Sequence, residues 1–482
     1  MLLPLCNHHD ASSLLSFKSQ FRVDGCSGTS TWYQSTYPKT ESWKNGTNCC
    51  FWNGVSCDTN SGRVIGLDLS GSCLQGEFDP NTTLFKLTHL QKLNLAFNDF
   101  SFSLMPSGFG HLLALTHLNL SYDGFSGLIP SEISHLSKLV SLDLSLSYGM
   151  RIESATLEKL IVNATQLREL ILDCLDMSLI KPSSLSLLVN FSSSLVSLSL
   201  HSTGLHWKLA NKILSLPNLQ ELDLSANGYI EGELPQSNWS TPLRHLDLSL
   251  STFSGHIQSL SNLTQLKYLA LCDSEFSGEI PLSLSNLQHL TYIDLSDNNF
   301  TGPIPQCMGN ISQLNYLVLH SNYFSGEIPS SLFNLHHLIH LDLSYNNFDG
   351  EIPNLFRKLS KLEVLDLSRN NLVGQLPSSL FGLTNLRDLS CYVNKLLGAI
   401  PEKNSGLSNL ANLDLSDNLL NGTIPRWCFS SSSLFNLHLS GNQLTGSIGE
   451  FSAFSLDICD LSHNKLQGVI PSQCFFSKIS LN

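Results

Sequence analysis

The chain has 482 residues, of which 39 are acidic and 26 basic, so its formal net charge is −13. This balance argues against nucleic-acid binding, because a protein that binds phosphate backbones needs a basic surface to neutralise them. It also provides no polybasic patch for a membrane surface, and no stretch reaches the roughly 18 continuous apolar residues of a membrane-spanning helix.

The N-terminal segment "MLLPLC" contains too few apolar residues for the core of a signal peptide, which needs roughly 7–15 of them. The last residues, "QCFFSKISLN", contain no recognisable C-terminal cap. We therefore expect the chain to be clipped at both ends, with its membrane anchor missing.

The first 60 residues are predicted to form an N-terminal cap for the repeats that follow. The segment "SSLLSFKSQF" has the apolar spacing of a helix, with Leu14, Leu15, Phe17 and Phe21 on one face. The later segment "WKNGTNCCFWNGVSCD" adds aromatic residues and three cysteines. Together these segments would cover the exposed end of the first repeat.

A repeat of the form L-x-x-L-x-L-x-x-N occupies residues 61–470, mostly with a period of 24 residues, and gives about 17 copies. The stretch 148–205 is irregular and contains a degenerate copy near 167–176, and residues 471–482 are interpreted as a truncated, uncapped end. The final position of the pattern falls at Ser72, Asn98, Asp123, Ser147, Thr203, Asn227, Ser251, Ser274, Asn298, Asn322, Asn346, Asn370, Asn394, Asn418, Asn442 and Asn464.

This period predicts an α/β solenoid built from leucine-rich repeats. The alternating x-L-x-L-x core forms a short strand with Leu pointing inward, and successive strands stack into a parallel sheet on the concave face. The repeated Asn can donate and accept hydrogen bonds, so we expect it to satisfy backbone groups of adjacent turns. In the recurring "GxIP" segment, Gly allows a tight turn and Pro enforces an extended one.

The consensus L-x-x-L-x-L-S-x-N-x-(L/F)-x-G-x-I-P and the leader C-C-x-W-x-G-V-x-C, here Cys49 to Cys57, resemble plant leucine-rich-repeat proteins. Segments such as "LCNHHDASSLLSFKSQF" and "GRVIGLDLSGSCLQGEF" resemble more closely the receptor-like proteins of the tomato leaf-mould resistance class. The resemblance implies a plant-type leucine-rich-repeat superhelix, an extracellular recognition role in plant defence, and signalling through a partner receptor kinase. It also implies the cap disulfides Cys6–Cys49 and Cys50–Cys57.

Thirteen cysteines and ten Asn-x-Ser/Thr sequons together indicate the secretory pathway. Cys26 has no obvious partner, and Cys391 and Cys459 occupy Leu positions, where we expect small buried side chains. Zinc is a poor alternative, because no paired C-x-x-C or H-x-x-x-H spacing occurs. The predicted glycosylation sites are Asn45, Asn81, Asn119, Asn163, Asn190, Asn238, Asn262, Asn299, Asn310 and Asn421.

The candidate binding face lies on the solvent-facing strand positions. Aromatic residues recur in register before the second Leu of successive strands, and Tyr is suited to interfaces because it combines apolar area with a hydroxyl group. The alternative interpretation is that these rings only stabilise the sheet by lateral packing. The predicted binding residues, for a peptide, protein or glycan ligand, are His245, Tyr268, Tyr292, Tyr316, His340, Tyr345, Arg369 and Tyr392.

A row of Asp residues at the middle strand position is interpreted mainly as a feature of the repeat consensus, with recognition of a cationic peptide as the functional alternative. We expect these solvated carboxylates to have unshifted pKa values. The row comprises Asp68, Asp143, Asp223, Asp247, Asp294, Asp342, Asp366, Asp414 and Asp460.

The chain contains no P-loop, G-x-S-x-G, H-E-x-x-H or kinase signature, so we predict that it is not an enzyme and needs no cofactor or metal. The favoured function is the ligand-sensing part of a cell-surface receptor on the extracellular side of the plasma membrane. The alternatives are a secreted inhibitor of microbial cell-wall hydrolases, which resembles this consensus but has fewer repeats, and a truncated decoy or nonfunctional relic.

Overall fold

The computed structural model describes residues 5–23, 37–147, 149–191, 194–206, 208, 211–235, 239–403, 406–448, 456–468 and 478–480. Cys26, Asn238 and most of the end at 471–482 lie outside the described residues. The chain divides into two compact units. Unit 1 comprises 1–232, 240–243 and 250–252, and unit 2 comprises 233–239, 244–249 and 253–482.

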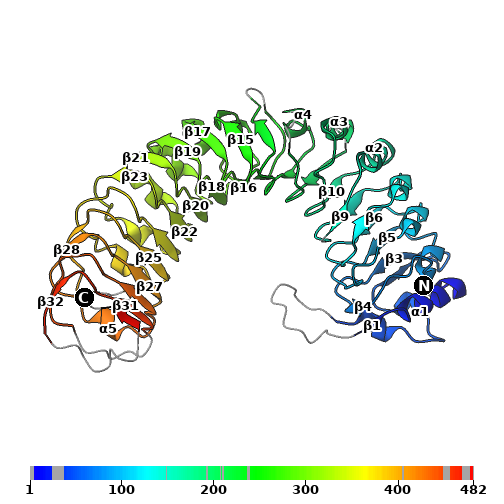
Figure 1. The fold of residues 1–482 in the computed structure, drawn as a ribbon, viewed down its shortest axis with the longest axis horizontal. Helices are drawn as coiled ribbons and strands as arrows, with labels where there is room; N and C mark the ends of the chain where they lie inside the picture. Colours follow the sequence, from blue (N-terminus) through cyan, green and yellow to red (C-terminus); the bar gives the residue numbers. More distant parts are fainter. Residues whose placement is uncertain are drawn as a thin grey trace. The chain divides into compact units, whose positions relative to one another are not determined.

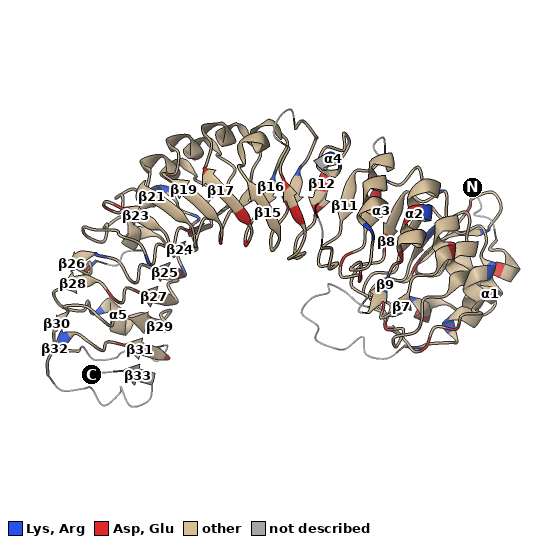
Figure 2. Ribbon diagram, turned by 45° about the horizontal axis from the view of Figure 1, so that its top comes forward, with Lys and Arg blue, Asp and Glu red and all other residues tan. Residues whose placement is uncertain are grey.

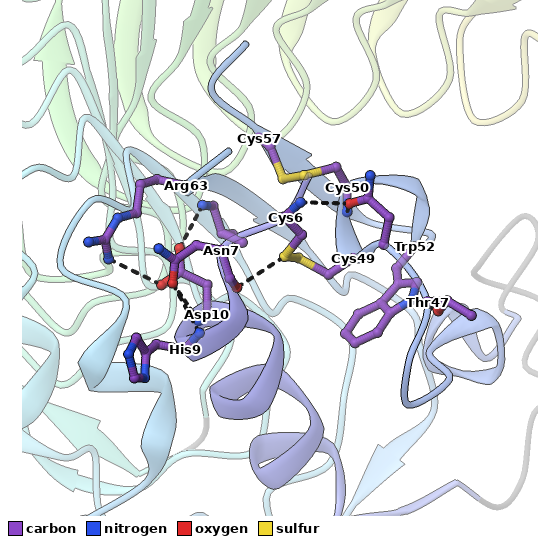
Figure 3. Close-up of a disulfide and its surroundings, with 12 residues drawn as sticks. Cys6, Asn7, His9, Asp10, Thr47, Cys49, Cys50, Trp52, Cys57 and Arg63 are labelled. Atoms are coloured by element: carbon purple, nitrogen blue, oxygen red, sulfur yellow. Dashed lines mark hydrogen bonds and ion pairs between the residues drawn. A yellow bond between two sulfur atoms is a disulfide. The ribbon is translucent and has the colours of Figure 1, made fainter. Parts of the chain in front are cut away.

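Unit 1 begins with the predicted cap. The helix α1 (His8–Lys18) is capped by Asn7, whose side chain accepts hydrogen bonds from the backbone of His9 and Asp10, and it buries Leu14 and Phe17. Disulfides join Cys6 to Cys49 and Cys50 to Cys57, with Cα–Cα distances of 5.4 and 5.5 Å (Figure 3). Cys73 is disulfide-bonded as well.

The cap is also tied to the first repeat strand. The buried Asp10 accepts a hydrogen bond from the backbone of Val64 and forms an ion pair with Arg63, with a 3.5 Å separation between nitrogen and oxygen (Figure 3). The ring of Trp43 stacks on that of Trp52 with 5.4 Å between their centroids. These contacts cover the end of the repeat array, which would otherwise expose its core to solvent.

The main sheet of unit 1 is parallel except for its first pair, in which β2 and β3 run antiparallel (Figure 1). Its strands, in spatial order, are β2 (Val55–Cys57), β3 (Val64–Asp68), β5 (Lys92–Asn94), β6 (His117–Asn119), β8 (Ser141–Asp143), β10 (Glu169–Ile171), β11 (Ser197–Ser199) and β12 (Glu221–Asp223). The predicted irregular stretch contributes β10 and β11, which continue the sheet in register.

The remaining elements of unit 1 are short. Two minor pairs are formed by β1 (Arg22–Val23) with β4 (Leu74–Gln75), and by β7 (Gly127–Leu128) with β9 (Met150–Arg151). The helical segments are η1 (Lys39–Ser42), η2 (Cys49–Phe51), η3 (Thr83–Lys86), η4 (Ser107–His111), η5 (Ser131–His135), α2 (Ser154–Asn163), α3 (Pro182–Ser186), η6 (Leu187–Phe191) and α4 (Asn211–Leu214). The strand β13 (Glu231–Glu233) lies where the two units meet in the sequence.

The main sheet of unit 2 is parallel throughout its described strands (Figure 1). These are β14 (His245–Asp247), β16 (Tyr268–Ala270), β18 (Tyr292–Asp294), β20 (Tyr316–Val318), β22 (His340–Asp342), β24 (Val364–Asp366), β25 (Asp388–Ser390), β27 (Asn412–Asp414), β29 (Asn436–His438), β31 (Ile458–Asp460) and β33 (Lys478–Ser480). The pairing of β33 with β31 adds a strand beyond the last repeat recognised from the pattern.

Short strands and single helical turns form the other side of each repeat in unit 2. The second sheet contains β15 (Thr252–Gly255), β17 (Glu275–Glu279), β19 (Asn299–Gly302), β21 (Tyr323–Glu327) and β23 (Asn347–Asp349), and two further pairs are β26 (Leu397–Ala399) with β28 (Leu419–Asn421) and β30 (Thr445–Gly446) with β32 (Lys465–Leu466). The turns are η7 (Gln258–Asn262), η8 (Leu282–Asn286), η9 (Gln306–Asn310), η10 (Ser330–Asn334), η11 (Phe356–Lys358), η12 (Leu380–Gly382) and α5 (Trp427–Ser430).

The apolar period explains why each strand lies as it does. In β18 the middle residue Ile293 is fully buried, whereas Tyr292 and Asp294 on either side are half-buried, and the same alternation recurs in the neighbouring strands. We call the side that carries the first and third strand residues the open face. Behind the sheet, Phe300, Phe324 and Phe348 stack at centroid distances of 6.0 and 6.2 Å, so each repeat covers the core of the next.

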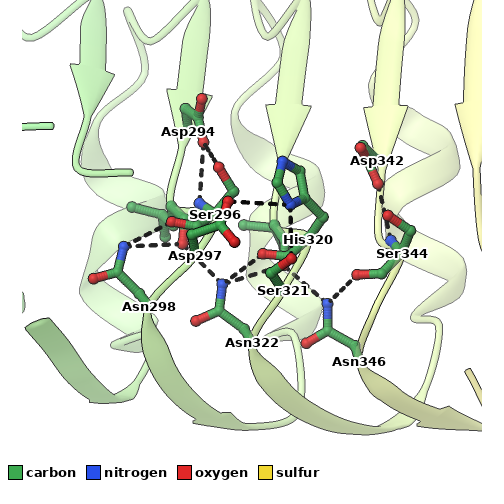
Figure 4. A network of polar contacts seen from close by, with 12 residues as sticks. Asp294, Ser296, Asp297, Asn298, His320, Ser321, Asn322, Asp342, Ser344 and Asn346 are labelled. Atoms are coloured by element: carbon green, nitrogen blue, oxygen red, sulfur yellow. Dashed lines mark hydrogen bonds and ion pairs between the residues drawn. The ribbon is translucent and has the colours of Figure 1, made fainter. Parts of the chain in front are cut away.

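The repeated Asn forms a continuous hydrogen-bonded ladder, as expected (Figure 4). The side-chain amide of Asn322 donates to the carbonyl oxygens of Leu295, Leu319 and His320 at 2.8–3.3 Å. Its oxygen accepts from the backbone N–H of Phe300 at 2.9 Å, one repeat earlier. Each buried amide therefore satisfies backbone groups of two repeats, which joins the turns along the array.

None of the described helices is long and apolar enough to cross a membrane.

Candidate functional site

Five aromatic rings on the open face of unit 2 form a continuous stack. The register places His245, Tyr268, Tyr292, Tyr316 and His340 side by side on β14, β16, β18, β20 and β22. The first three rings are nearly parallel, with centroid distances of 4.2 and 4.4 Å and interplanar angles of 6° and 9°. Tyr316 is tilted by 40° from Tyr292 at 5.6 Å, and it lies 6.0 Å from His340.

The two inner tyrosines are held in a low-dielectric setting beside carboxylates. Burial, followed by the charge of Asp247, raises the pKa of Tyr268 to about 12. Burial and the charge of Asp294 raise the pKa of Tyr292 still further, and its hydroxyl donates to that carboxylate at 3.3 Å. Both phenols therefore stay protonated at neutral pH and offer hydroxyl groups rather than charges.

The other three predicted binding residues form a separate cluster at the ends of the strands. The hydroxyls of Tyr345 and Tyr392 are 2.9 Å apart, and the guanidinium carbon of Arg369 lies 4.9 Å and 5.4 Å from the centroids of their rings. The Nε of Arg369 donates to the Tyr392 hydroxyl at 3.3 Å. Cation–π contact on both sides thus orders an exposed Arg without a carboxylate partner among the described residues.

Backbone conformation explains why this cluster projects from the surface. Tyr345 and Arg369 have φ values of +51° and +49°, in the left-handed region that non-glycine residues rarely adopt. The same conformation recurs immediately before most ladder positions of unit 2, because the chain must leave the strand there. Among the described residues, no ring contact or hydrogen bond joins this cluster to the five-ring stack, so the predicted site consists of two separate groups.

The Asp row has a structural role that the repeat pattern does not reveal. Asp294 accepts hydrogen bonds from the backbone N–H and hydroxyl of Ser296, at 3.0 and 2.6 Å, and so caps the turn that follows the strand (Figure 4). Equivalent bonds occur at Asp143, Asp223, Asp414 and Asp460.

The expectation of unshifted pKa values along this row is wrong for several members. Burial raises the pKa of Asp366, because the carboxylate is largely removed from water. The pKa of Asp68 is lowered: burial opposes the shift, but hydrogen bonds from Ser70 and the nearby Lys39 outweigh it. Acidic residues recur in β18, β22, β24, β25 and β27, none of which contains Lys or Arg (Figure 2).

The predicted glycosylation sites in the described part of unit 2 lie outside its open face. Within the described part of this unit, sequon residues lie on the helical turns and the second-sheet strands, and all are exposed: Asn262, Asn299, Asn310 and Asn421. In unit 1, Asn45, Asn81, Asn163 and Asn190 are exposed as well, whereas Asn119 is half-buried on β6. Sugars attached at these four described sites of unit 2 would thus start from elements other than the strands that carry the aromatic stack.

The cysteines offer little for metal chemistry. In the described part of unit 1, three potential ligand atoms lie close together on Cys6, Cys49 and Cys50. Their sulfurs are already committed to disulfides. Cys391 and Cys459 are fully buried at Leu positions. Burial raises the pKa of the Cys391 thiol far above its ordinary value, which makes it unreactive.

Comparisons with known proteins agree with this architecture. Residues 241–438 match the family described as "Leucine-rich repeat region", and residues 114–136 and 86–101 match further leucine-rich-repeat families. Receptor-like protein 6 of Arabidopsis thaliana is 38% identical over 286 residues, which cover 55% of this chain and 28% of that protein. Receptor-like protein Cf-9 of Solanum pimpinellifolium is 39% identical over 271 residues, 54% of this chain and 31% of that protein. The chain thus spans about a third of the length of these curated relatives.

Solved structures with the same fold include several peptide-hormone receptors. The plant peptide hormone receptor RGFR1 in complex with RGF2 aligns with a TM-score of 0.65 at 28% identity, covering 90% of this chain and 79% of that chain. The Arabidopsis receptor kinase HAESA, in complex with the peptide hormone IDA and the co-receptor SERK1, aligns with a TM-score of 0.63 at 25% identity, covering 99% of both chains.

Proposed function

Since the chain is a leucine-rich-repeat protein of the plant receptor-like type, we propose that it is the non-catalytic recognition part of a cell-surface receptor in plant defence. Its ligand is a peptide or an extended segment of a protein, bound on the open face of unit 2. The observation that carries this proposal is the five-ring stack on a face free of described sequons. Signalling through a partner receptor kinase is part of the same proposal.

The geometry of the stack favours a polypeptide over a glycan. A sugar ring packs against the open face of an aromatic ring, but both faces of Tyr268 are covered by His245 and Tyr292 at 4.2 and 4.4 Å. The stack therefore presents ring edges and hydroxyl groups, which suit the carbonyl groups and side chains of a peptide. The neighbouring carboxylates favour a ligand with basic side chains.

Fold-level comparison supports the same ligand class. The two receptors described above were solved with peptide hormones bound, and PEPR1, solved with AtPEP1, also has this fold with a TM-score of 0.58 at 26% identity. Repeat arrays recognise ligands with residues that can vary without disturbing the core. Tyr292 and Tyr316 are such residues, because the buried middle residue of each strand carries the packing.

The proposal is tested by replacing Tyr268, Tyr292 and Tyr316 together with Ala. Peptides selected from a random display library against the full chain serve as probes, and their affinities are measured by surface plasmon resonance. We expect at least about a hundredfold loss of affinity, because truncating interface tyrosines typically costs about 1–2 kcal/mol each.

The control is Tyr323→Ala, which removes an exposed tyrosine of the same unit from β21 on the second sheet. This variant should bind the selected peptides as the unchanged chain does. Unaltered binding by a folded triple variant would contradict the proposed site. Selected peptides whose binding is lost only when residues of unit 1 are replaced would place the ligand elsewhere.

A further inference from the structure

A hollow of about 570 Å³ opens on the open face of unit 1, beside the cap. It is bounded by β2, β3, β5 and β6 and ends at Ser141 of β8. The register explains its shape: the residues paired across adjacent strands are Gly66, Lys92, His117 and Ser141. The large side chains of Lys92 and His117 thus lie between the small residues Gly66 and Ser141, which leaves space around them.

A hydrogen bond to the neighbouring Thr116 engages one ring nitrogen of His117. The hydroxyl of Thr116 donates its one hydrogen to the carbonyl of Gln91 at 3.0 Å. The same hydroxyl lies 2.9 Å from Nδ1 of His117, so while it donates to Gln91 it can only accept from Nδ1. In that tautomer of neutral His117 the other nitrogen, Nε2, is an unprotonated base.

Some polar side chains in and near the hollow are bonded to other described residues, whereas others are not. Asp68 is neutralised by Lys39 at 3.0 Å, and the amide nitrogen of Asn119 donates to Asp143 at 3.1 Å. By contrast, no described residue pairs with the ammonium of Lys92, and the amide of Asn94 uses only its oxygen, for the backbone of Ala96. Free donors therefore collect around Lys92.

We propose that this hollow is a second binding site, which takes a carboxylate group of a small ligand between Lys92 and His117, with the amide of Asn94 as a further donor. A charge-assisted hydrogen bond from an ammonium to a carboxylate is about twice as strong as a neutral one. The site is independent of the aromatic stack, because all of its residues belong to unit 1.

Carboxylate binding at this site is coupled to protonation. Burial, followed by the charge of Lys92, lowers the pKa of His117, and Glu169 acts in the opposite direction. A carboxylate bound beside the ring raises that pKa again, so a proton is taken up at Nε2 on binding. Affinity should consequently increase as the pH falls. Of the other charged groups near the hollow, Asp68 forms an ion pair with Lys39, whereas Asp143 accepts a hydrogen bond from the neutral amide of Asn119.

The experiment uses the full chain and succinate as the probe, with binding measured by isothermal titration calorimetry. We expect Lys92→Met to weaken succinate binding about tenfold or more, the effect of losing one charge-assisted bond. In the unchanged chain, affinity should rise between about pH 8 and about pH 5.5, and His117→Gln should abolish this rise while preserving part of the binding.

The matched control is Lys138→Met, which removes an exposed lysine of the same unit away from the hollow and should leave binding unchanged. Equal losses for Lys92→Met and Lys138→Met, or no succinate binding at all, would overturn the proposal. Glycopeptide mass spectrometry at Asn119 provides an independent check. A glycan there would fill the hollow and exclude the ligand, whereas we expect an unmodified side chain held by Asp143.

Discussion

The substitution Asp123→Asn is expected to remove a pH-dependent loss of stability of about 4 kcal/mol. Asp123 occupies a ladder position where most repeats have Asn, and it is fully buried. One carboxylate oxygen accepts hydrogen bonds from Phe125 and Ser147, but the other has no partner among the described residues. Burial therefore raises the pKa of Asp123 to about 7.

The direction of the effect follows from proton binding. The folded chain retains the proton up to about pH 7, whereas the unfolded chain releases it near pH 3.8, so stability is greatest below pH 3.8 and falls as the pH rises to about 7. About three pKa units at 1.36 kcal/mol each give the stated magnitude. Asn carries no proton to lose, so the variant should lack this contribution, and its stability should fall less between about pH 4 and about pH 7 than that of the unchanged chain. Urea unfolding at several pH values measures the difference.

The control for this experiment is Asp99→Asn, the same chemical change at an exposed carboxylate of the same unit. It should retain the pH dependence of the unchanged chain. A profile for Asp123→Asn that falls as steeply as that of the unchanged chain would show that another buried acid is responsible. Asp173 of the same unit, whose pKa is also raised by burial, would then be the first residue to replace.

Replacing Asn346 with Ala should destabilise unit 2 by about 1–3 kcal/mol. Its amide donates to the carbonyls of Leu319, Ser344 and Leu343 at 2.9–3.3 Å, and its oxygen accepts from Phe324 at 3.0 Å. The three carbonyls each keep another donor, from Asn322, Asn370 and the backbone of Ser321. The buried N–H of Phe324 loses its acceptor, and an unsatisfied buried donor costs about 1–3 kcal/mol. Urea unfolding of the full chain measures the loss.

Asn347→Ala is the matched control, because Asn347 is the next residue and is exposed at the start of β23. Its replacement should change the free energy of unfolding by less than about 0.5 kcal/mol, as is usual for surface positions. A similar loss for both variants would mean that the Asn ladder contributes no more than any surface side chain, and the ladder would then not be what joins neighbouring repeats.

The repeat architecture could be predicted because it depends on local, recurring physics. A strand of alternating Leu, a polar residue that turns the chain and a Gly–Pro segment recur at short intervals, so each copy supports the interpretation of the others. The strands β5, β6 and β8 and the Asn ladder lie at the predicted positions. The cap disulfides could be named only through the family resemblance, because cysteine spacing alone allows many pairings.

The candidate site could be predicted as a set of residues but not as a geometry. Register alone brings Tyr268, Tyr292 and Tyr316 side by side, because adjacent repeats have similar lengths. Whether such rings stack face to face or stand apart depends on rotamers and on neighbours such as Asp294, which no pattern encodes. The pairing of Arg369 with two tyrosines at the strand ends could not be predicted for the same reason. The pattern offered one signal, because Tyr345 and Arg369 each stand directly before a ladder Asn, where the chain turns.

Sequence by itself determined the repeat, the parallel sheet, the capped start and the acidic balance, because these follow from residue types at fixed spacing. Tertiary structure decided which Asp is buried with one carboxylate oxygen unpartnered, which sequon lies in a hollow, and which nitrogen of His117 lies beside the Thr116 hydroxyl. Those properties depend on the distances between side chains of different repeats. These distances are set by small departures from the repeat, for example Asp in place of Asn at position 123 and Gly in place of a larger residue at position 66.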